Sequence, residues 1–305
     1  MAHSDFDVFM VSWDLTLRAD GYADNTLLAY RNAVRNLADW LAEHHPTIGP
    51  VELGRDHVRG WLAHIRKTRS MSTARGWFAG VRHFCRWLQA EGETDRDATA
   101  GIKTPAPGDP KTPVLDLDDF RALLSSCVGG DFIARRDAAI LMVLLDGGLR
   151  LSELAGLRVT DVDLRDRMVF VEGKASRRSG PRHRAVPIGV KAARMIDRYL
   201  RKRRSHPFAD SPALWLGDRG RATLSADGID AMLKRRAAAA GIEGLHPHMF
   251  RHSWAHAFRA AGGSEGDLML LGGWRSRAML DRYGKSAAAD RAAEAYRRLS
   301  LGDRL

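Results

Sequence analysis

Two glycines and an arginine stand together near the middle of the chain, where residues 147–154 read GGLRLSEL. An arginine that follows a double glycine at the end of an apolar, buried helix is unusual, because a charged group there needs a partner. Glu153 lies three residues after Arg150 and could orient it. On these eight residues alone, a structural ion pair and a functional arginine remain equal alternatives.

A second group of polar side chains lies in residues 246–252, which read HPHMFRH. His248 and Arg251 are three residues apart, so a helix would place both on one face. Two histidines on a helix can also bind a metal, but no HExxH motif and no additional carboxylate support such a site. We expect core or capping roles for His252 and His256, and we expect neither a metal nor a cofactor.

Tyr283 is one of five tyrosines in the chain and the one that is followed by glycine near a predicted helix end. It comes nine residues after Trp274, which closes the segment LLGGW. Taken alone, Trp274 fits a core position better than a functional one. Tyr30, in contrast to Tyr283, follows the periodicity of a helix core.

Residues of these types could together catalyse the cleavage of a phosphodiester bond without a metal. A nucleophile must attack phosphorus, cations must balance the charge on the non-bridging oxygens, and an acid must protonate the leaving 5′ oxygen. Arginine suits the second role because its planar guanidinium is permanently charged and bidentate. It cannot be the acid, because it does not release its proton near neutral pH, whereas lysine can.

The order of these motifs resembles the tyrosine recombinase family, which includes phage integrases and Xer-type recombinases. The matching pieces are Gly-Leu-Arg-x-Ser-Glu-Leu, then His-x-x-Arg, then Leu-Gly-x-Trp with a tyrosine nine residues later. The resemblance covers the whole chain, because Thr26, Tyr30 and the Trp40-Leu41 and Trp87-Leu88 pairs resemble the family's helical core-binding domain.

The resemblance implies a role for each site residue. Arg150 and Arg251 would clamp the scissile phosphate, and His248 would assist proton transfer at Tyr283, the nucleophile. Trp274 stands where many members have histidine, and it can donate its N–H but cannot shuttle protons. The resemblance further implies that the acid is Lys174 and that Glu153 orients groups rather than reacts. Basic residues cluster between Arg55 and Arg86, and they form either a solvated helical surface or a face that contacts DNA through residues such as Arg75 and Arg82. Arg177 and Arg178 are further expected DNA contacts.

The reaction implied by the resemblance is two transesterifications through a 3′-phosphotyrosyl link, without ATP or a metal. The implied partners are double-stranded DNA with a recombination site and a homotetramer on two duplexes, or a related recombinase. A type IB topoisomerase and a non-catalytic DNA-binding protein on the recombinase fold are the alternatives. The target sequence and the biological role, which could be phage integration, chromosome-dimer resolution or transposition, are not determined by these motifs.

Helical periodicity dominates the first hundred residues. We predict a short helix at 9–17, a long helix that opens at Thr26 and stops at Pro46, and two more through 58–65 and from 72 to near Gly92. This predicts a four-helix domain at residues 1–95, which the resemblance implies is a SAM-like, DNA-binding domain. Residues 96–113, rich in proline and glycine, form the predicted linker to a catalytic domain at 114–305.

The second domain is predicted to be mostly α with a small β element. Helices are expected at 116–124, 134–145, 190–204, 227–240, 250–261 and 266–271, and two paired strands at 168–171 and 184–188. A basic turn between the strands carries Lys174 as its only amine, among Arg177, Arg178, Arg182 and Arg184. A further short helix is expected at 287–299.

Charge supports a polyanionic partner. Residues 1–109 contain 13 Lys+Arg against 14 Asp+Glu, whereas the remaining residues contain 35 against 23. A basic field attracts nucleic acid, although composition alone would also suit a ribosomal or membrane-surface protein. No apolar run reaches the roughly 18 residues of a membrane span. With Cys85 and Cys127 as expected reduced core thiols, we predict a cytoplasmic, nucleoid-associated protein.

Overall fold

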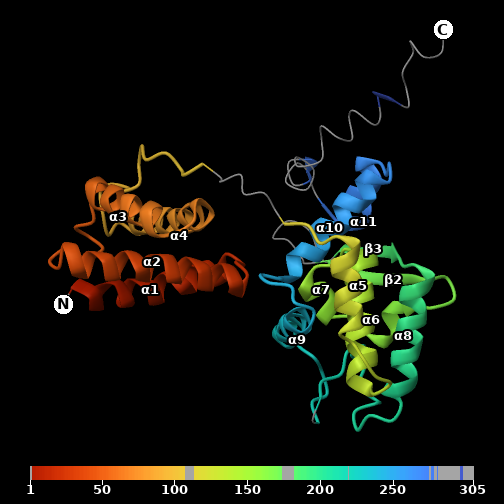
Figure 1. Ribbon diagram of the computed structural model, residues 1–305. Helices are drawn as coiled ribbons and strands as arrows, with labels where there is room; N and C mark the ends of the chain where they lie inside the picture. The colour runs from red at the N-terminus through yellow and green to blue at the C-terminus, as the bar shows by residue number, and fades with distance from the viewer. Residues whose placement is uncertain are drawn as a thin grey trace. The chain divides into compact units, whose positions relative to one another are not determined.

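A computed structural model of the chain describes residues 2–106, 113–173, 182–218, 220–274, 276–277, 280 and 296–297. The chain divides into two compact units, Met1–Pro110 and Lys111–Leu305, each with its own contacts (Figure 1). Tyr283 and Lys174, together with Arg177, Arg178 and the helix expected at 287–299, lie outside the described residues apart from 296–297.

The N-terminal unit consists of four helices in two layers. One layer pairs α1 (Ala2–Ala19) with α2 (Asp24–His44), and the other pairs α3 (Arg55–Thr68) with α4 (Met71–Ala90), as Figure 1 shows. This confirms the four predicted helices. The first is longer than the predicted 9–17, because the buried stripe of Met10, Trp13 and Leu17 continues one turn further back to Phe6.

Tryptophan and phenylalanine side chains fill the space between these layers. Trp13, Trp61, Phe78 and Phe84 are all fully buried. A buried indole N–H needs an acceptor, and Trp61 Nε1 donates to Asn36 Oδ1 at 3.0 Å, while Trp13 Nε1 donates to His83 at 3.1 Å. The aromatic core is therefore both packed and hydrogen bonded, and Cys85 is buried in it as expected.

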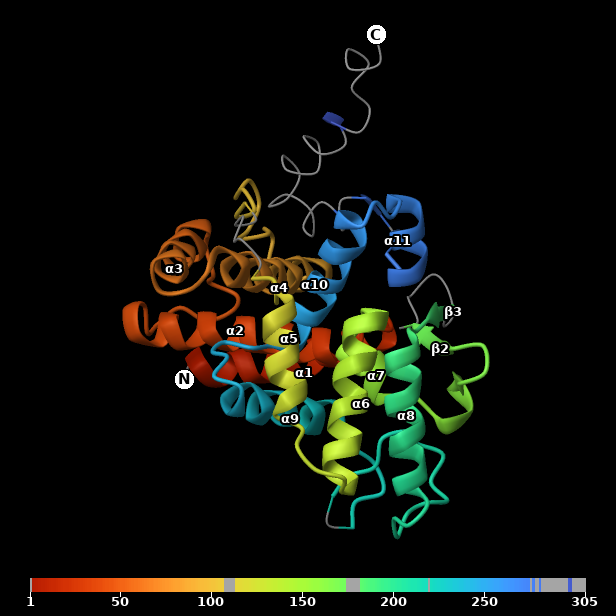
Figure 2. The same cartoon turned by 45° about the vertical axis from the view of Figure 1, so that its right-hand side comes forward.

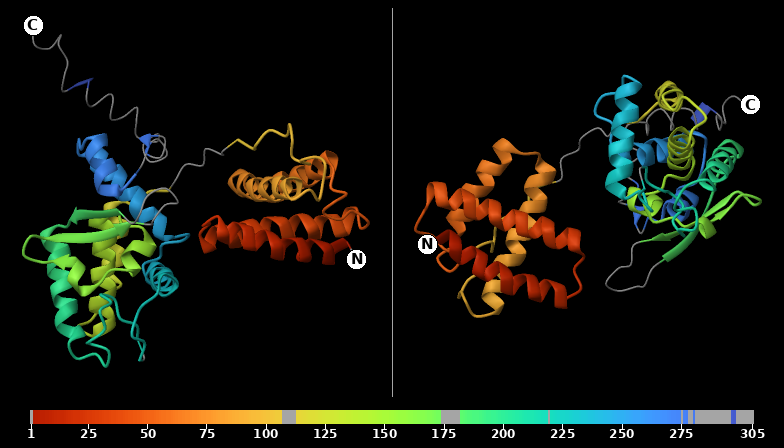
Figure 3. Two further views of the ribbon diagram at one scale, coloured as in Figure 1. Left: turned by 180° about the vertical axis from the view of Figure 1, so that it is seen from behind. Right: turned by 90° about the horizontal axis from the view of Figure 1, so that it is seen from below.

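The C-terminal unit is largely helical with one small sheet. Its helices are α5 (Leu117–Ser125), α6 (Phe132–Gly147), α7 (Leu151–Ala155), α8 (Val190–Arg203), α9 (Ala226–Ala239), α10 (Pro247–Ala260) and α11 (Glu265–Gly272). After a 3-10 turn, η1 (Val159–Asp161), come β1 (Val162–Asp163), β2 (Met168–Gly173) and β3 (Arg182–Pro187). The three strands are antiparallel in the order β1-β2-β3, and Figure 3 shows them together at the edge of the unit.

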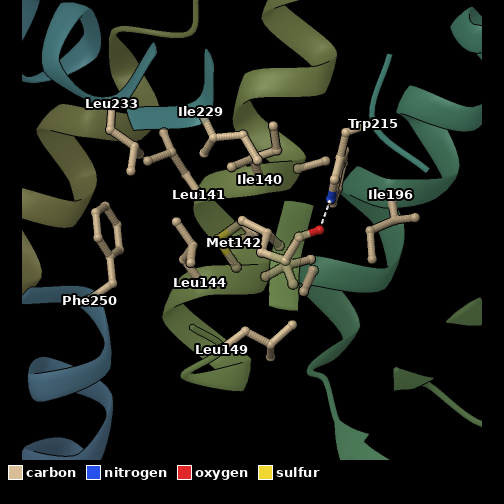
Figure 4. Packing of buried hydrophobic residues seen from close by; sticks show 14 of the residues in the cluster. Ile140, Leu141, Met142, Leu144, Leu149, Ile196, Trp215, Ile229, Leu233 and Phe250 are labelled. Atoms are coloured by element: carbon tan, nitrogen blue, oxygen red, sulfur yellow. Dashed lines mark hydrogen bonds between the residues drawn. The ribbon is translucent and has the colours of Figure 1, made fainter. Parts of the chain in front are cut away.

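Helix α6 forms the centre of this unit. Its residues from Ala139 to Leu144 are all buried, which confirms the prediction of a buried apolar helix. It packs along α8, and Figure 2 shows the two helices side by side. Figure 4 shows Ile140, Leu141 and Met142 of α6 among side chains from several other elements, with the hydrogen bond that Trp215 donates to the Leu154 carbonyl at 2.9 Å.

A charged network lies under the first turns of α6. Arg136 and Asp137 are 2% and 1% exposed, and Arg136 Nη2 lies 2.9 Å from Asp137 Oδ1. Asp137 Oδ2 also accepts from Arg236 of α9 at 2.7 Å, and Arg136 donates to the Leu216 carbonyl. Buried charges need paired, hydrogen-bonded partners, so this network fixes how α6 and α9 meet.

Two findings differ from the sequence expectations for this unit. Helix α7 and strand β1 were not predicted, because five and two residues are too short to show a periodicity. Strand β3 begins at Arg182, two residues before the predicted start at Arg184, so both of these arginines, which were grouped with the basic turn, lie in the strand, with Arg184 opposite Val171 of β2. In the part of the chain that the structure describes, no helix is long and apolar enough to cross a membrane.

Candidate active site

Arg150 lies where α6 ends and α7 begins. Gly148 takes the left-handed conformation (φ +54°), which turns the chain out of α6 and leaves Arg150 extended at the N-terminus of α7. Its Nη1 donates to Glu153 Oε1 at 2.6 Å, and its backbone N–H donates to Glu153 Oε2 at 2.8 Å. The Arg150 side chain is 35% exposed, so the guanidinium is held at one side and open at the other.

Glu153 is shared by two arginines. Its side chain is 3% exposed, and Arg184 of β3 places Nη2 2.8 Å from Oε2 and Nη1 3.1 Å from Oε1. Burial alone would raise the pKa of Glu153, but the hydrogen bonds from Arg184 and from the Arg150 backbone, with both positive charges, leave this pKa below its usual value. Glu153 is therefore a stable carboxylate that joins α7 to the sheet.

Arg251 of α10 is completely buried. Its Nη1 donates to the Gly148 carbonyl at 2.6 Å, and its Nη2 donates to the Gly272 carbonyl. These carbonyls lie at the C-termini of α6 and α11, where helix dipoles favour a cation. The guanidinium carbon also lies 4.1 Å from the ring centroid of Trp274, a cation–π contact. One cation therefore joins two helix ends and the tryptophan.

The glycine pairs at these helix ends are required by close packing. A Cβ on Gly148 would lie 2.2 Å from the ring of Trp254, and one on Gly272 would lie 2.2 Å from the ring of Trp274. Gly273 takes φ +65° at the end of α11, as Gly148 does at the end of α6. Both helices thus end with a left-handed glycine, and at each end a glycine leaves room for a tryptophan ring, Trp254 at Gly148 and Trp274 at Gly272.

His248 and His252 lie one turn apart on α10. Pro247 starts the helix, where its missing N–H is of no consequence. His248 is exposed, and its ring meets that of the buried His252 edge-on at 4.6 Å. Desolvation of the inner side of the ring, followed by the charge of Arg251, lowers the pKa of His248. Desolvation and His248 lower the pKa of His252 to about 4, so both rings are neutral at pH 7.

The structure brings Arg150, Glu153, His248, Arg251 and Trp274 together, although α7, α10 and α11 supply them from distant parts of the sequence. Trp274 is 5% exposed, which fits the packing role as well as the one implied by the resemblance. Among the described residues, no group of three or more histidine, cysteine or acidic side chains could hold a metal ion.

The predicted DNA-contacting residues Arg75 and Arg82 belong to the N-terminal unit. Arg75 is exposed on α4. Arg82 is half-buried and donates to the Ile102 carbonyl at 2.6 Å and to Thr104 Oγ1 at 2.9 Å. Its guanidinium also covers the ring of Phe78 at 4.5 Å. Arg82 thus holds the chain that follows α4, a structural role that the sequence did not suggest.

Sequence reasoning missed Arg184 and the part played by Gly273. A signal for Arg184 was present, because side chains alternate along a strand and Arg184 falls on the same face as the buried Val186 and Ile188. No comparable pattern exists for Gly273. A Cβ added at Gly273 would lie 3.3 Å from Arg184 Nη1, a contact that only the folded chain reveals.

Comparison with known proteins gives the same family over both units. The model of the phage integrase family matches residues 113–290, and that of the phage integrase N-terminal SAM-like domain matches residues 9–92. Tyrosine recombinase XerC of Pseudomonas fluorescens is 36% identical over 235 residues, which cover 76% of this chain and 75% of that protein. Tyrosine recombinase XerD of Pseudomonas putida is 33% identical over 240 residues, with 77% and 78% covered.

A solved structure shares the fold. The Tn1549 transposon integrase in complex with transposon right end DNA aligns with a TM-score of 0.75 at 19% identity, and the alignment covers 96% of this chain and 99% of that one. At this identity the likeness concerns the fold: a four-helix SAM-like domain followed by an α+β domain.

Proposed function

Because this chain belongs to the phage integrase family of tyrosine recombinases, we propose that it is a site-specific DNA recombinase in which Tyr283 attacks the scissile phosphate. The observation that carries the proposal is that Arg150, His248, Arg251 and Trp274, which come from the ends of three helices, lie close together. Such an array of fixed cations and N–H donors suits a phosphate that gains charge during attack.

The proposed chemistry keeps the energy of the broken bond. The Tyr283 hydroxyl loses its proton and bonds to phosphorus, which gives a 3′-phosphotyrosyl link while the 5′ oxygen leaves and takes a proton from Lys174. A 5′ hydroxyl of a second duplex then attacks the link and frees the tyrosine. His248, neutral because of its lowered pKa, can accept the proton from Tyr283 in the first step.

The arginines have different surroundings and so different proposed duties. Arg150 has an exposed side and is the direct phosphate ligand, bidentate through its planar fork. Arg251, buried under Trp274, adds positive charge from a low-dielectric position where it acts strongly. Trp274 contributes an N–H donor and excludes water, which leaves proton transfer to Lys174 and His248.

The proposed partner is double-stranded DNA with a recombination site. Four active sites on two duplexes are needed for strand exchange, so we propose a homotetramer or an assembly with a related recombinase. Residues 1–95 would bind DNA with Arg75, residues 96–113 would link, and residues 114–305 would react and bind DNA with Arg177 and Arg178. The protein would act in the cytoplasm at the nucleoid, without a metal or cofactor.

Covalent trapping tests the nucleophile. A nicked suicide duplex that carries the target site should give a protein–DNA adduct on a denaturing gel, and Tyr283→Phe should abolish the adduct while specific binding persists. Tyr296→Phe is the matched control, because Tyr296 is a tyrosine from the same end of the chain, 73% exposed. An adduct with the Tyr283→Phe variant would refute the assignment, and binding without any wild-type adduct would favour the non-catalytic alternative.

Strand exchange separates a recombinase from a type IB topoisomerase. Two duplexes with one labelled site each should give recombinant products in the presence of the wild-type protein. Relaxation of supercoils by a monomer, without recombinant product, would instead favour the topoisomerase.

A further inference from the structure

Arg184 is a buried cation that belongs to none of the proposed catalytic roles. It lies in β3, where its side chain points inward with those of Val186 and Ile188, and it is 11% exposed. Its three nitrogens all have acceptors: two donate to Glu153 and Nε donates to the Leu271 carbonyl at 2.8 Å. A single guanidinium thus joins β3, α7 and the last turn of α11.

The contacts of Arg184 determine how much of the positive charge of Arg150 is neutralised by Glu153. Each carboxylate oxygen of Glu153 accepts twice: Oε1 from Nη1 of Arg150 and of Arg184, and Oε2 from the Arg150 backbone and from Arg184 Nη2. Two guanidinium charges therefore share one carboxylate charge. Because Arg184 is nearly buried and Arg150 is partly exposed, the surplus positive charge is presented at Arg150.

The other end of Arg184 meets the turn that carries Trp274. The Leu271 carbonyl accepts from Nε, and Gly273 is packed against the guanidinium so closely that a Cβ would lie 3.3 Å from Nη1. The Gly273 carbonyl in turn lies 3.5 Å from Arg150 Nη2. Arg184 therefore fixes both the carboxylate below Arg150 and the backbone beside it.

We propose that Arg184 is a positioning residue for DNA cleavage: it shares the charge of Glu153 and holds residues 271–273, so that Arg150 faces the phosphate with unneutralised charge. Without Arg184, Glu153 would pair with Arg150 alone and draw its guanidinium away from the substrate. The proposal rests on the proposed recombinase function, but it assigns Arg184 no contact with DNA.

Single-turnover cleavage of the suicide duplex, measured beside equilibrium binding of the same DNA, tests this role. Arg184→Gln should lower the cleavage rate about 10- to 100-fold, because small misplacements of a catalytic group cost that much, while the Kd for DNA changes by less than about threefold. Arg184→Lys keeps the charge but not the fork, so its rate should lie between those of Arg184→Gln and the wild type. His183→Gln, an exposed neighbour on β3, is the control and should cleave as the wild type does.

A double-mutant cycle with Glu153→Gln shows whether Arg184 acts through Glu153. The double variant should cleave no more slowly than the slower single variant, because the two residues form one unit. Independent, multiplicative losses would overturn the proposal, and so would a loss of binding as large as the loss of rate. Thermal unfolding of each variant identifies any that do not fold, in which case Arg184→Lys supplies the same two comparisons. If the wild type itself forms no adduct, the proposed function fails; if it does and Arg184→Gln cleaves normally, only this inference fails.

Discussion

Arg150 and Arg251 have the same side chain, but the fold gives them opposite surroundings. Arg150 keeps 35% of its side chain in solvent and has a carboxylate partner, whereas Arg251 is buried and donates to two glycine carbonyls. A buried arginine without hydrogen-bond acceptors would be strongly destabilising, so the helix ends that receive Arg251 are part of the site. The sequence motif around each arginine reveals neither its exposure to solvent nor its hydrogen-bond partners.

Lys174 is predicted to be the acid that protonates the leaving 5′ oxygen. Lys174→Ala should lower the cleavage rate of an ordinary duplex about 100-fold or more, as loss of a general acid does. A duplex with a 5′-bridging sulfur should restore the rate, because a thiolate leaves without a proton. Lys191→Ala, an exposed lysine at the start of α8, should behave as the wild type with both duplexes. Failure of the sulfur substrate to rescue Lys174→Ala would remove this role.

His252 is predicted to make the stability of the chain depend on pH. Its pKa is lowered from 6.5 to about 4 in the folded chain, so between those values the unfolded chain binds the proton more tightly. The free energy of unfolding should therefore fall as the pH drops from 6.5 to about 4, by roughly 1–3 kcal/mol from this residue. Urea unfolding at pH 7 and pH 5 measures the difference.

His252→Gln should reduce this pH dependence and leave the part that comes from the lowered pKa of His248, even if its stability at pH 7 is lower. His256→Gln, one turn further along α10, should keep it, because His252 is still present. A pH dependence that is the same in His252→Gln and in the wild type would contradict the assignment.

At the residue scale, the short motifs identify residues that lie close together in the fold. Arg150, Glu153, His248, Arg251 and Trp274 are neighbours in the structure. Their catalytic roles, and those of Lys174 and Tyr283, stay predictions. Arg184 was predicted at the start of a strand and grouped with the basic turn before it, but no role was predicted for it, because its hydrogen bonds reach residues 31 and 87 positions away.

Helix ends, more than helix interiors, build this site. Helices α6 and α11 both finish with two glycines, and the second glycine of each is left-handed. The amphipathic pattern of a helix predicts its middle, so every long helix was found. Its ends depend on what packs against the last turn, and for that reason the short α7 and the glycine packing could not be predicted.

The end of α6 should tolerate no side chain at Gly148. Gly148→Ala adds the cost of a left-handed alanine, about 1–2 kcal/mol, and a clash with Trp254, whose ring would be 2.2 Å away. Overpacking adds about 1–3 kcal/mol more. The free energy of unfolding, measured with urea, should fall by the sum, and cleavage should fall with it.

Gly241→Ala is the matched control for that change. Gly241 follows α9 with φ +72°, and a Cβ there would meet no atom within 4 Å. It should lose only the left-handed cost and should cleave normally. Equal losses of stability in Gly148→Ala and Gly241→Ala would show that the contact with Trp254 is unimportant.

For the whole molecule, the excess of basic residues lies in the C-terminal part, while residues 1–109 are close to neutral. A near-neutral unit can still bind DNA if its cations gather on one face. The two predicted contact residues of α4 differ in exposure and in hydrogen bonding. Arg75 is exposed, whereas Arg82 is half-buried and hydrogen bonded to Ile102 and Thr104.

Salt dependence of DNA binding should distinguish these two arginines. Each phosphate contact releases counterions, so Arg75→Gln should reduce the slope of log K against log salt by about 1 and should leave thermal stability unchanged. Arg82→Gln should instead lower the stability of the N-terminal unit by about 1 kcal/mol, because the partly buried Ile102 carbonyl loses its donor. Binding isotherms at several salt concentrations and urea unfolding measure both. An unchanged slope in Arg75→Gln would exclude it as a phosphate contact.

The cation shared by two helix ends also governs how this part of the protein opens. Arg251 holds the Gly148 carbonyl, two residues before Arg150, and the Gly272 carbonyl, two residues before Trp274. A fluctuation that frees either helix end takes an acceptor from a fully buried charge and so costs nearly as much as one that frees both. In native-state hydrogen exchange, we therefore expect the amides of the two ends to belong to one cooperative unit with a common opening free energy. In the proposed recombinase, a duplex would thus meet either a complete set of phosphate ligands or none.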